Sequence, residues 1–288
     1  MITALYLVTF IITLSMTEYY LVRNPKVDNL FVCFGIALIL NSGGRFLLAV
    51  SSSLDMALFS QKLIYIGNCY CPFLLIHLLT RMCGAPVNVI GAGRTDAGVH
   101  ARAMVANAYM DTDMEPEAIR DYLNHYLPDD IGVAEVKEAA DRFHARYRAV
   151  GKLYTYTCYV GETKPVFNRK YVTVLDGKPD VEKMRKAAEF LVGEHDFRSF
   201  CANPQMKKST VRIVDSIEIQ QKKDLLYLNF HGTGFLQNMV RILTGTLLEV
   251  GFGRRSVESV KEVLEAKDRK LAGYTAPPQG LCLMRVDY

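Results

Sequence analysis

The sequence contains no tryptophan and no Cys-x-x-Cys pair, although it is 288 residues long. Its seven cysteines are odd in number, a pattern typical of reduced thiols and of neither a disulfide framework nor a zinc site. A strong charge of one sign is also lacking, because 34 basic side chains nearly balance 30 acidic ones and leave a net charge of +4. So small an excess does not by itself indicate a nucleic-acid partner.

Charge is scarce at the beginning of the chain, where residues 1–84 hold only eight of the 64 charged side chains. Residues 1–22, 29–50 and 63–79 are candidates for membrane-spanning helices, because about 20 apolar residues cross the hydrocarbon core. Buried helices of a soluble domain and a secretory signal peptide are the alternatives, and the second fits poorly because no basic residue precedes the first stretch. We therefore predict a transmembrane helical segment over residues 1–78 that anchors the chain in the cytoplasmic membrane.

The basic residues of this segment predict its orientation. Arg23 and Lys26 fall in the first short loop and Arg81 follows the third stretch, whereas Lys62 alone falls in the second loop. Because cytoplasmic loops carry the excess of Lys and Arg, the chain after Arg81 is expected to be cytoplasmic.

From about residue 79 the pattern is that of an α+β protein with mostly antiparallel sheets flanked by helices. Residues 211–220 and 224–232 are expected to form an antiparallel pair, and Asp180 is expected to cap the N-terminus of a helix. Other expected strands cover residues 87–91, 101–112, 131–139, 151–161 and 280–288, and expected helices cover residues 115–127, 179–193, 234–251 and 256–268.

One turn concentrates residues with catalytic chemistry. The stretch GAGRTDAGVH (91–100) places Arg94 and Asp96 among small residues, directly after an apolar strand. Its glycines do not have the spacing of a dinucleotide fingerprint, and no phosphate-loop lysine follows. Small residues allow the backbone to approach a ligand, and an arginine near an aspartate favours the ionised carboxylate. Asp96 is therefore predicted to be a nucleophile or a general base, and a plain glycine-rich connection is the alternative.

The stretch GAGRTDAGVHA (91–101) is similar to the signature of the TruA-type tRNA pseudouridine synthases. Four further blocks resemble that family in order, FHARYRAVGKLYTYTCY (143–159), GEHDFRSFC (193–201), GFLQNMVRILTGTLLEVG (234–251) and APPQGLCLMRVDY (276–288). The resemblance covers about residues 79–288. It implies a pseudouridine synthase fold of two subdomains, isomerisation of uridine to pseudouridine at positions 38 to 40 of the tRNA anticodon arm, no metal or cofactor, and a homodimer.

The resemblance also implies roles for four residues. Asp96 matches the aspartate that attacks the target uridine, and Arg241 matches the arginine that pairs with it. Tyr154 matches the tyrosine that packs on the target base, and Arg94 matches the signature arginine that helps to hold the flipped nucleotide. Physical reasoning agrees, since an extruded base needs an aromatic face and an arginine in an apolar helix needs a partner. A core tyrosine and a surface arginine are the alternatives. Phosphate contacts are expected from the basic residues Arg102, Arg142, Arg146, Arg148, Lys152, Lys207, Lys208 and Arg212.

The beginning of the chain departs from that family. The first strand of the family, with its Tyr-Asp-Gly, and most of the first helix are absent, and the membrane-like segment stands in their place. We therefore expect a transmembrane segment (1–78), a truncated N-terminal catalytic subdomain (79–143) and a C-terminal catalytic subdomain (144–288). The alternative is a chimeric or truncated chain with impaired catalysis that acts at most as a membrane-tethered RNA-binding module.

Overall fold

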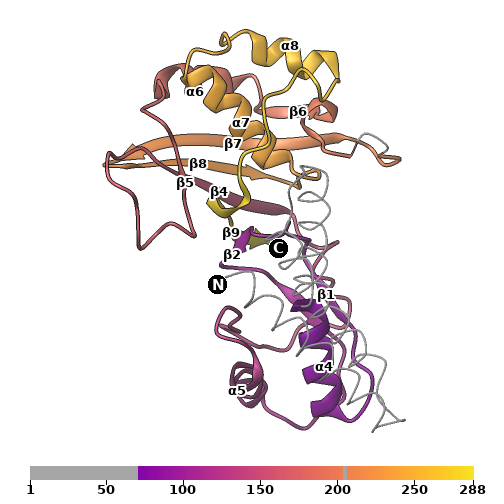
Figure 1. Ribbon diagram of the computed structural model, residues 1–288. Helices are drawn as coiled ribbons and strands as arrows, with labels where there is room; N and C mark the ends of the chain where they lie inside the picture. The colour runs from indigo at the N-terminus through magenta and orange to yellow at the C-terminus, as the bar shows by residue number, and fades with distance from the viewer. Residues whose placement is uncertain (1–70, 204–205) are drawn as a thin grey trace, which may run out of the picture. The chain divides into compact units, whose positions relative to one another are not determined.

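The computed structural model describes residues 71–203 and 206–288, which belong to two compact units (Figure 1). Of these residues, the first unit contains 71–89 and 107–142, and the second contains 90–106 and 143–288. The glycine-rich turn therefore belongs to the second unit, whereas the subdomain predicted over residues 79–143 includes it. All four predicted site residues consequently lie in one unit.

The predicted transmembrane segment lies almost wholly in residues 1–70, outside the described residues. The end of its third apolar stretch belongs to helix α4 (Cys71–Cys83), which is 13 residues long. Among the residues that the structure describes, no helix combines the length and the apolar character needed to cross a bilayer. The described residues therefore give no support to the predicted membrane anchor.

The first unit pairs α4 with helix α5 (Pro116–Tyr126). Its core contains Leu78, Leu79, Ile119 and Leu123, each at most 6% exposed. Ile119 and Leu123 lie four residues apart and therefore share one face of α5. The helix predicted over residues 115–127 is confirmed, with a proline in its first turn, where no N–H partner is needed.

The prediction of a strand over residues 131–139 is wrong, because the side chain of Asn124 and not a neighbouring strand pairs with the backbone of this segment. The amide Nδ2 of Asn124 donates to the carbonyl of Val133 at 2.8 Å, and the N–H of Val133 donates to Oδ1 of Asn124 at 2.7 Å. Ile131, Val133 and Val136 still pack against the core of the first unit. The alternating pattern thus indicates an extended segment that packs one face against the core, and it does not indicate pairing in a sheet.

A seven-stranded sheet forms the frame of the second unit in the described part of the chain. The strand order is β2-β9-β4-β8-β7-β6, with β5 beside β4. Only β2–β9 and β4–β5 pair in parallel, which confirms a mostly antiparallel α+β unit, and β7–β8 is the predicted hairpin. The strands are β2 (His100–Ala101), β4 (Gly151–Tyr159), β5 (Thr173–Val174), β6 (Gly193–Asp196), β7 (Val211–Lys222), β8 (Leu225–Gly232) and β9 (Leu281–Asp287).

The single strand predicted over residues 101–112 is two short strands. β2 pairs with β9, and the N–H of Arg102 continues that ladder by donating to the carbonyl of Leu283 at 2.8 Å. The chain then bends, and β3 (Ala106–Ala108) pairs with β1 (Val89–Gly91) in a separate two-stranded sheet. An alternating pattern does not reveal this division, because both halves are extended.

Helices α6 (Val181–Glu189), α7 (Met239–Gly251) and α8 (Ser259–Ala266) lie together on one side of the larger sheet (Figure 1). The predicted cap of α6 is confirmed, because Oδ1 of Asp180 accepts a hydrogen bond from the N–H of Lys183 at 3.1 Å. Such a cap satisfies one of the N–H groups that a helix leaves free at its first turn. Two short 3₁₀ turns, η1 (Arg198–Phe200) and η2 (Pro278–Gly280), precede β7 and β9 in the chain.

Helix α7 differs from the amphipathic helix predicted over residues 234–251. It begins only at Met239, because Asn238 adopts the left-handed conformation with φ of 58°. Eleven of its 13 residues are buried, so it is a core helix that is covered on nearly all sides. Arg241 is therefore a charged residue inside the core helix of the second unit.

Candidate active site

The glycine-rich turn starts at the end of β1 and is closed by a tight reversal at Asp96. The carbonyl of Asp96 accepts a hydrogen bond from the N–H of Val99 at 3.0 Å. Gly98, the third residue of this reversal, has φ of +80°, a conformation that favours glycine. A side chain there would also meet Pro278 at 3.1 Å. This geometry fixes the backbone that carries the Asp96 carboxylate.

Asp96 and Arg241 lie together although 145 positions separate them in the chain. The Nη1 atom of Arg241 lies 3.2 Å from Oδ2 of Asp96. Arg241 is 14% exposed and Asp96 is 35% exposed, so the cation is inside and the carboxylate remains open to solvent. In the described part of the chain, the Oδ1 atom of Asp96 makes no ion pair or hydrogen bond. One carboxylate oxygen is thus held and the other is free to react.

Two further groups hold Arg241, and sequence reasoning missed both. Its Nε donates to the carbonyl of Ala276 at 2.7 Å, and its Nη1 also donates to Oδ1 of Asn238 at 2.9 Å. A buried guanidinium is costly unless its donors find partners, and these oxygens provide them. The spacing of three between Asn238 and Arg241 is a detectable signal for the contact with Asn238. A backbone carbonyl has no sequence signal.

Arg94 is exposed, and the ion pair of Asp96 among the described residues is with Arg241 rather than with Arg94. Among the described residues, no ion pair between Arg94 and Asp96 supports the expectation that Arg94 favours the ionised form of Asp96. An exposed guanidinium two residues from Asp96 remains available to a ligand.

Tyr154 presents its ring from β4 beside the Asp96 carboxylate. Burial, and secondly the negative charge of Asp96, raise the pKa of Tyr154 to about 12. The phenol therefore stays neutral at physiological pH. Its ring meets that of Phe235 edge to face, with centroids 5.4 Å apart, an arrangement that favours aromatic pairs. The register of β4 against β9 shifts between Leu153 and Tyr154, but the extra residue is Met284 on β9, and β4 keeps a regular register with β8.

The basic residues predicted to contact phosphate divide into two groups. The N–H groups of Arg212 donate to backbone carbonyls, including that of Ser209 at 3.0 Å. The ammonium of Lys152 donates to the carbonyl of Ala92 at 2.9 Å. These two side chains therefore stabilise the protein's own backbone. Six remain exposed and stay predicted phosphate contacts, namely Arg102, Arg142, Arg146, Arg148, Lys207 and Lys208.

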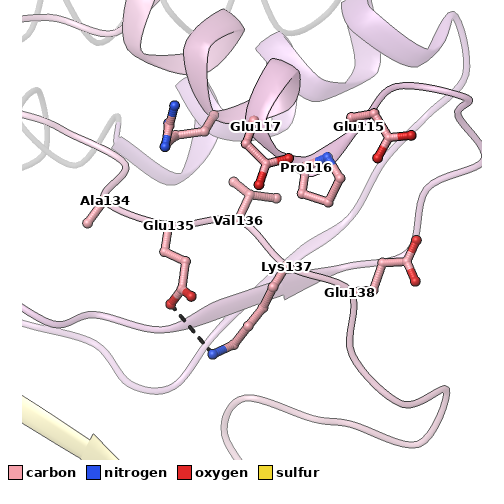
Figure 2. Close-up of a pocket in the computed structure, with 9 residues that line it drawn as sticks. Glu115, Pro116, Glu117, Ala134, Glu135, Val136, Lys137 and Glu138 are labelled. Atoms are coloured by element: carbon pink, nitrogen blue, oxygen red, sulfur yellow. Dashed lines mark hydrogen bonds and ion pairs between the residues drawn. The ribbon is translucent and has the colours of Figure 1, made fainter.

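A hollow in the first unit has a different character (Figure 2). It lies between the start of α5 and residues 134–138, and no predicted site residue lines it. Its carboxylates disfavour a phosphate ligand. They belong to Glu115, Glu117, Glu135 and Glu138, of which Glu135 pairs with Lys137 at 3.5 Å. In the described ranges, this hollow included, no three His, Cys, Asp or Glu side chains gather as a metal site requires.

Comparison with known proteins gives a consistent result. The family model for tRNA pseudouridine synthases matches residues 56–148 and 187–288. The tRNA pseudouridine synthase A of Clostridium kluyveri is 44% identical over 200 residues, which are 69% of this chain and 82% of that protein. The protein of the same name from Geobacter sp. strain M21 is 46% identical over 215 residues, 74% of this chain and 87% of its own. That of Citrifermentans bemidjiense is 44% identical over 236 residues, 78% of this chain and 94% of its own.

The matched residues include Arg94, Asp96 and Arg241, whereas Tyr154 lies between the two matched segments. The match begins at residue 56, within the stretch predicted to be membrane and well before residue 79, where the resemblance was expected to start. Less of the family is therefore replaced than the sequence analysis predicts.

Proposed function

Because the chain belongs to the tRNA pseudouridine synthase family, we propose that it converts uridine to pseudouridine at positions 38 to 40 of the tRNA anticodon arm. The family makes it an isomerase that acts on tRNA. The anticodon positions and the residue roles below are the parts that we propose. The catalytic part then works in the cytoplasm, where its tRNA substrate is, and a homodimer remains a prediction.

Isomerisation exchanges one bond for another within a single nucleotide. The C1′–N1 bond breaks, the detached uracil turns, and a C1′–C5 bond forms, while C5 releases a proton and N1 takes one up. The balance needs no oxidant, reductant or second substrate. We assign the nucleophile to Asp96, whose carboxylate bonds to C1′ as the C1′–N1 bond breaks and is displaced from C1′ as the C1′–C5 bond forms.

The neighbouring residues support that step in different ways. Arg241 orients the carboxylate through the 3.2 Å contact between Nη1 and Oδ2. Tyr154 offers a neutral aromatic face to a base that has left the stack, with Phe235 at its edge. Arg94, which is exposed beside Asp96, is placed to hold the flipped nucleotide.

The observation that carries the proposal is the asymmetric ion pair of Asp96. Arg241 is 14% exposed and belongs to the core helix, whereas Asp96 is 35% exposed. Asp96, the carboxylate that the proposal makes reactive, is thus the partner that is accessible to solvent and hence to RNA. Its geometry is fixed by a core helix on one side and a glycine turn on the other.

The test is Asp96→Asn in the full chain, assayed by tritium release from tRNA labelled at C5 of uridine. We expect release to fall at least about a hundredfold, because an amide does not attack carbon as a carboxylate does. Asp176→Asn, at an exposed aspartate of the same unit, is the matched control and should keep the wild-type rate.

Two results count against the proposal. If folded Asp96→Asn keeps more than about a tenth of the rate, a loss of little over 1 kcal/mol, Asp96 is not the nucleophile. If mapping of the modified tRNA places pseudouridine outside positions 38 to 40, the proposed substrate positions are wrong.

A further inference from the structure

Lys152 reaches from β4 to the beginning of the glycine-rich turn. Its Nζ donates to the carbonyl of Ala92 at 2.9 Å. Ala92 is fully buried, and its own N–H donates to the carbonyl of Val105 at 2.8 Å, so this part of the backbone is fixed on both sides. Burial, and secondly the positive charge of Arg146, lower the pKa of Lys152. The ammonium is therefore partly desolvated, which its hydrogen bond must offset.

Lys152 and Tyr154 are two residues apart on β4 and therefore project to the same face of the sheet. The first side chain holds Ala92, and the second lies in the field of Asp96. One strand thus holds the beginning of the turn through Lys152 and carries the tyrosine that senses the charge of Asp96. We propose that Lys152 is a positioning residue, which holds the glycine-rich turn against β4 so that Asp96 stays in register with Arg241 and the target uridine. This role rests on the function proposed above.

Phosphate binding, which the sequence analysis predicts for Lys152, is the competing role. Six of the other basic residues predicted with it are exposed, whereas Lys152 is part-buried and its ammonium is engaged with the backbone. An ammonium that binds phosphate contributes to tRNA affinity, so its loss raises KM and reduces the dependence on salt. An ammonium that holds the turn contributes to the placement of Asp96, so its loss lowers kcat, because a displacement of about 1 Å can cost about 10²-fold.

Gly93 provides a second way to disturb the same contact. A methyl group at this position would lie 3.1 Å from Nζ of Lys152 and within 4 Å of no other atom beyond its chain neighbours. The φ of Gly93 lies outside the left-handed region, so alanine fits the backbone. Gly93→Ala therefore displaces the ammonium and introduces no other clash with the described residues.

The experiment measures kcat and KM of the full chain by tritium release from tRNA, at matched concentrations of folded protein. Lys152→Met keeps the aliphatic part of the side chain without the donor, and Lys152→Arg keeps a donor. Gly93→Ala and the double variant Gly93→Ala/Lys152→Met complete a double-mutant cycle with Lys152→Met. Lys222→Met, at the exposed end of β7, is the matched control. Thermal unfolding of each variant confirms that it is folded.

We expect Lys152→Met to lower kcat at least about tenfold with KM within about threefold of the wild type. Lys152→Arg should recover most of that loss, and Gly93→Ala should lower kcat in the wild type but have little effect on top of Lys152→Met. Lys222→Met should behave as the wild type.

Three results overturn the role. An active wild type with kcat of folded Lys152→Met within about twofold shows that the contact does not position Asp96. A raised KM with unchanged kcat identifies a phosphate contact instead. Additive effects of the two substitutions show that Gly93 and Lys152 do not act through one contact. Absence of tritium release from the wild type is a different failure, because it overturns the proposed function and this role with it.

Discussion

At the scale of single residues, the backbone of Asn238 and the charge of Arg241 depend on each other. Asn238 adopts φ of 58°, which few residues other than glycine tolerate, and its side chain accepts from Nη1 of Arg241 at 2.9 Å. Asparagine combines tolerance of this conformation with a short side-chain acceptor. Aspartate is the other residue type that combines both properties.

Substitutions of Asn238 separate these two requirements. Asn238→Gly and Asn238→Ala both remove the acceptor, so we expect both to lower kcat by about tenfold or more through a misplaced Arg241. Both variants lose a hydrogen bond of Arg241, and alanine also adopts the left-handed conformation at a cost of about 1–2 kcal/mol, so Asn238→Ala should lose more stability in urea unfolding than Asn238→Gly. Equal kcat values for the wild type and Asn238→Gly would show that this side chain does not position Arg241.

Local chemistry explains which residues could be predicted from the sequence. The cap at Asp180 was predictable because the cap and its helix are adjacent in the chain. The contact of Arg241 with Asp96 followed from the family resemblance and not from pattern, because 145 positions separate the two. The carbonyl of Ala276 could not be predicted, since every residue type has the same carbonyl group.

At the scale of elements, α7 and the segment of residues 273–276 are packed backbone to backbone. A methyl group at Gly245 would lie 1.9 Å from the carbonyl oxygen of Tyr274. Two residues further on, the N–H of Ala276 donates to the carbonyl of Arg241 at 3.1 Å. Glycine at position 245 thus permits the close approach that lets a backbone carbonyl reach the Arg241 guanidinium.

Gly245→Ala should therefore reduce both stability and activity. We expect about 1–3 kcal/mol of destabilisation in urea, because a backbone segment must move to admit the methyl group. The rate of tritium release should also fall, because the carbonyl of Ala276 moves with that segment. Gly132→Ala, where a methyl group meets nothing within 4 Å, should change stability by less than about 0.5 kcal/mol. A Gly245→Ala variant as stable as the wild type would show that this packing is loose.

Elements with a strong local pattern were predicted correctly, and those decided by a distant partner were not. The β7–β8 hairpin and helices α5 and α6 follow from periodicity and local capping. Residues 131–139 have a strand pattern, but the side chain of Asn124 forms hydrogen bonds with the backbone of Val133 in place of a partner strand. Residues 101–112 also have a strand pattern, but they divide between two different sheets. The pattern of an extended segment does not by itself specify which strand or side chain its backbone pairs with.

At the scale of the whole molecule, the family match predicts which part of the chain is needed for activity. The match begins at residue 56, and the four proposed site residues all lie in the second unit. Removal of residues 2–55 should therefore leave kcat/KM within about threefold of the full chain. Removal of residues 2–70 is the matched comparison and should lower activity, because it takes part of the matched segment. A large loss on removal of residues 2–55 would show that the unmatched residues contribute to catalysis.

The position of β9 in the sheet affects how the protein is synthesised. β9 lies between β2, which follows the turn of Asp96, and β4, which carries Tyr154 and Lys152. The ribosome adds about 5–20 residues per second, so on the order of ten to forty seconds pass between the synthesis of Asp96 and that of β9. During that time the growing chain contains Asp96, the proposed nucleophile, without the strand that lies between β2 and β4. We therefore expect that a nascent chain does not modify the RNA around it and that tRNA modification begins only after β9 has left the ribosome.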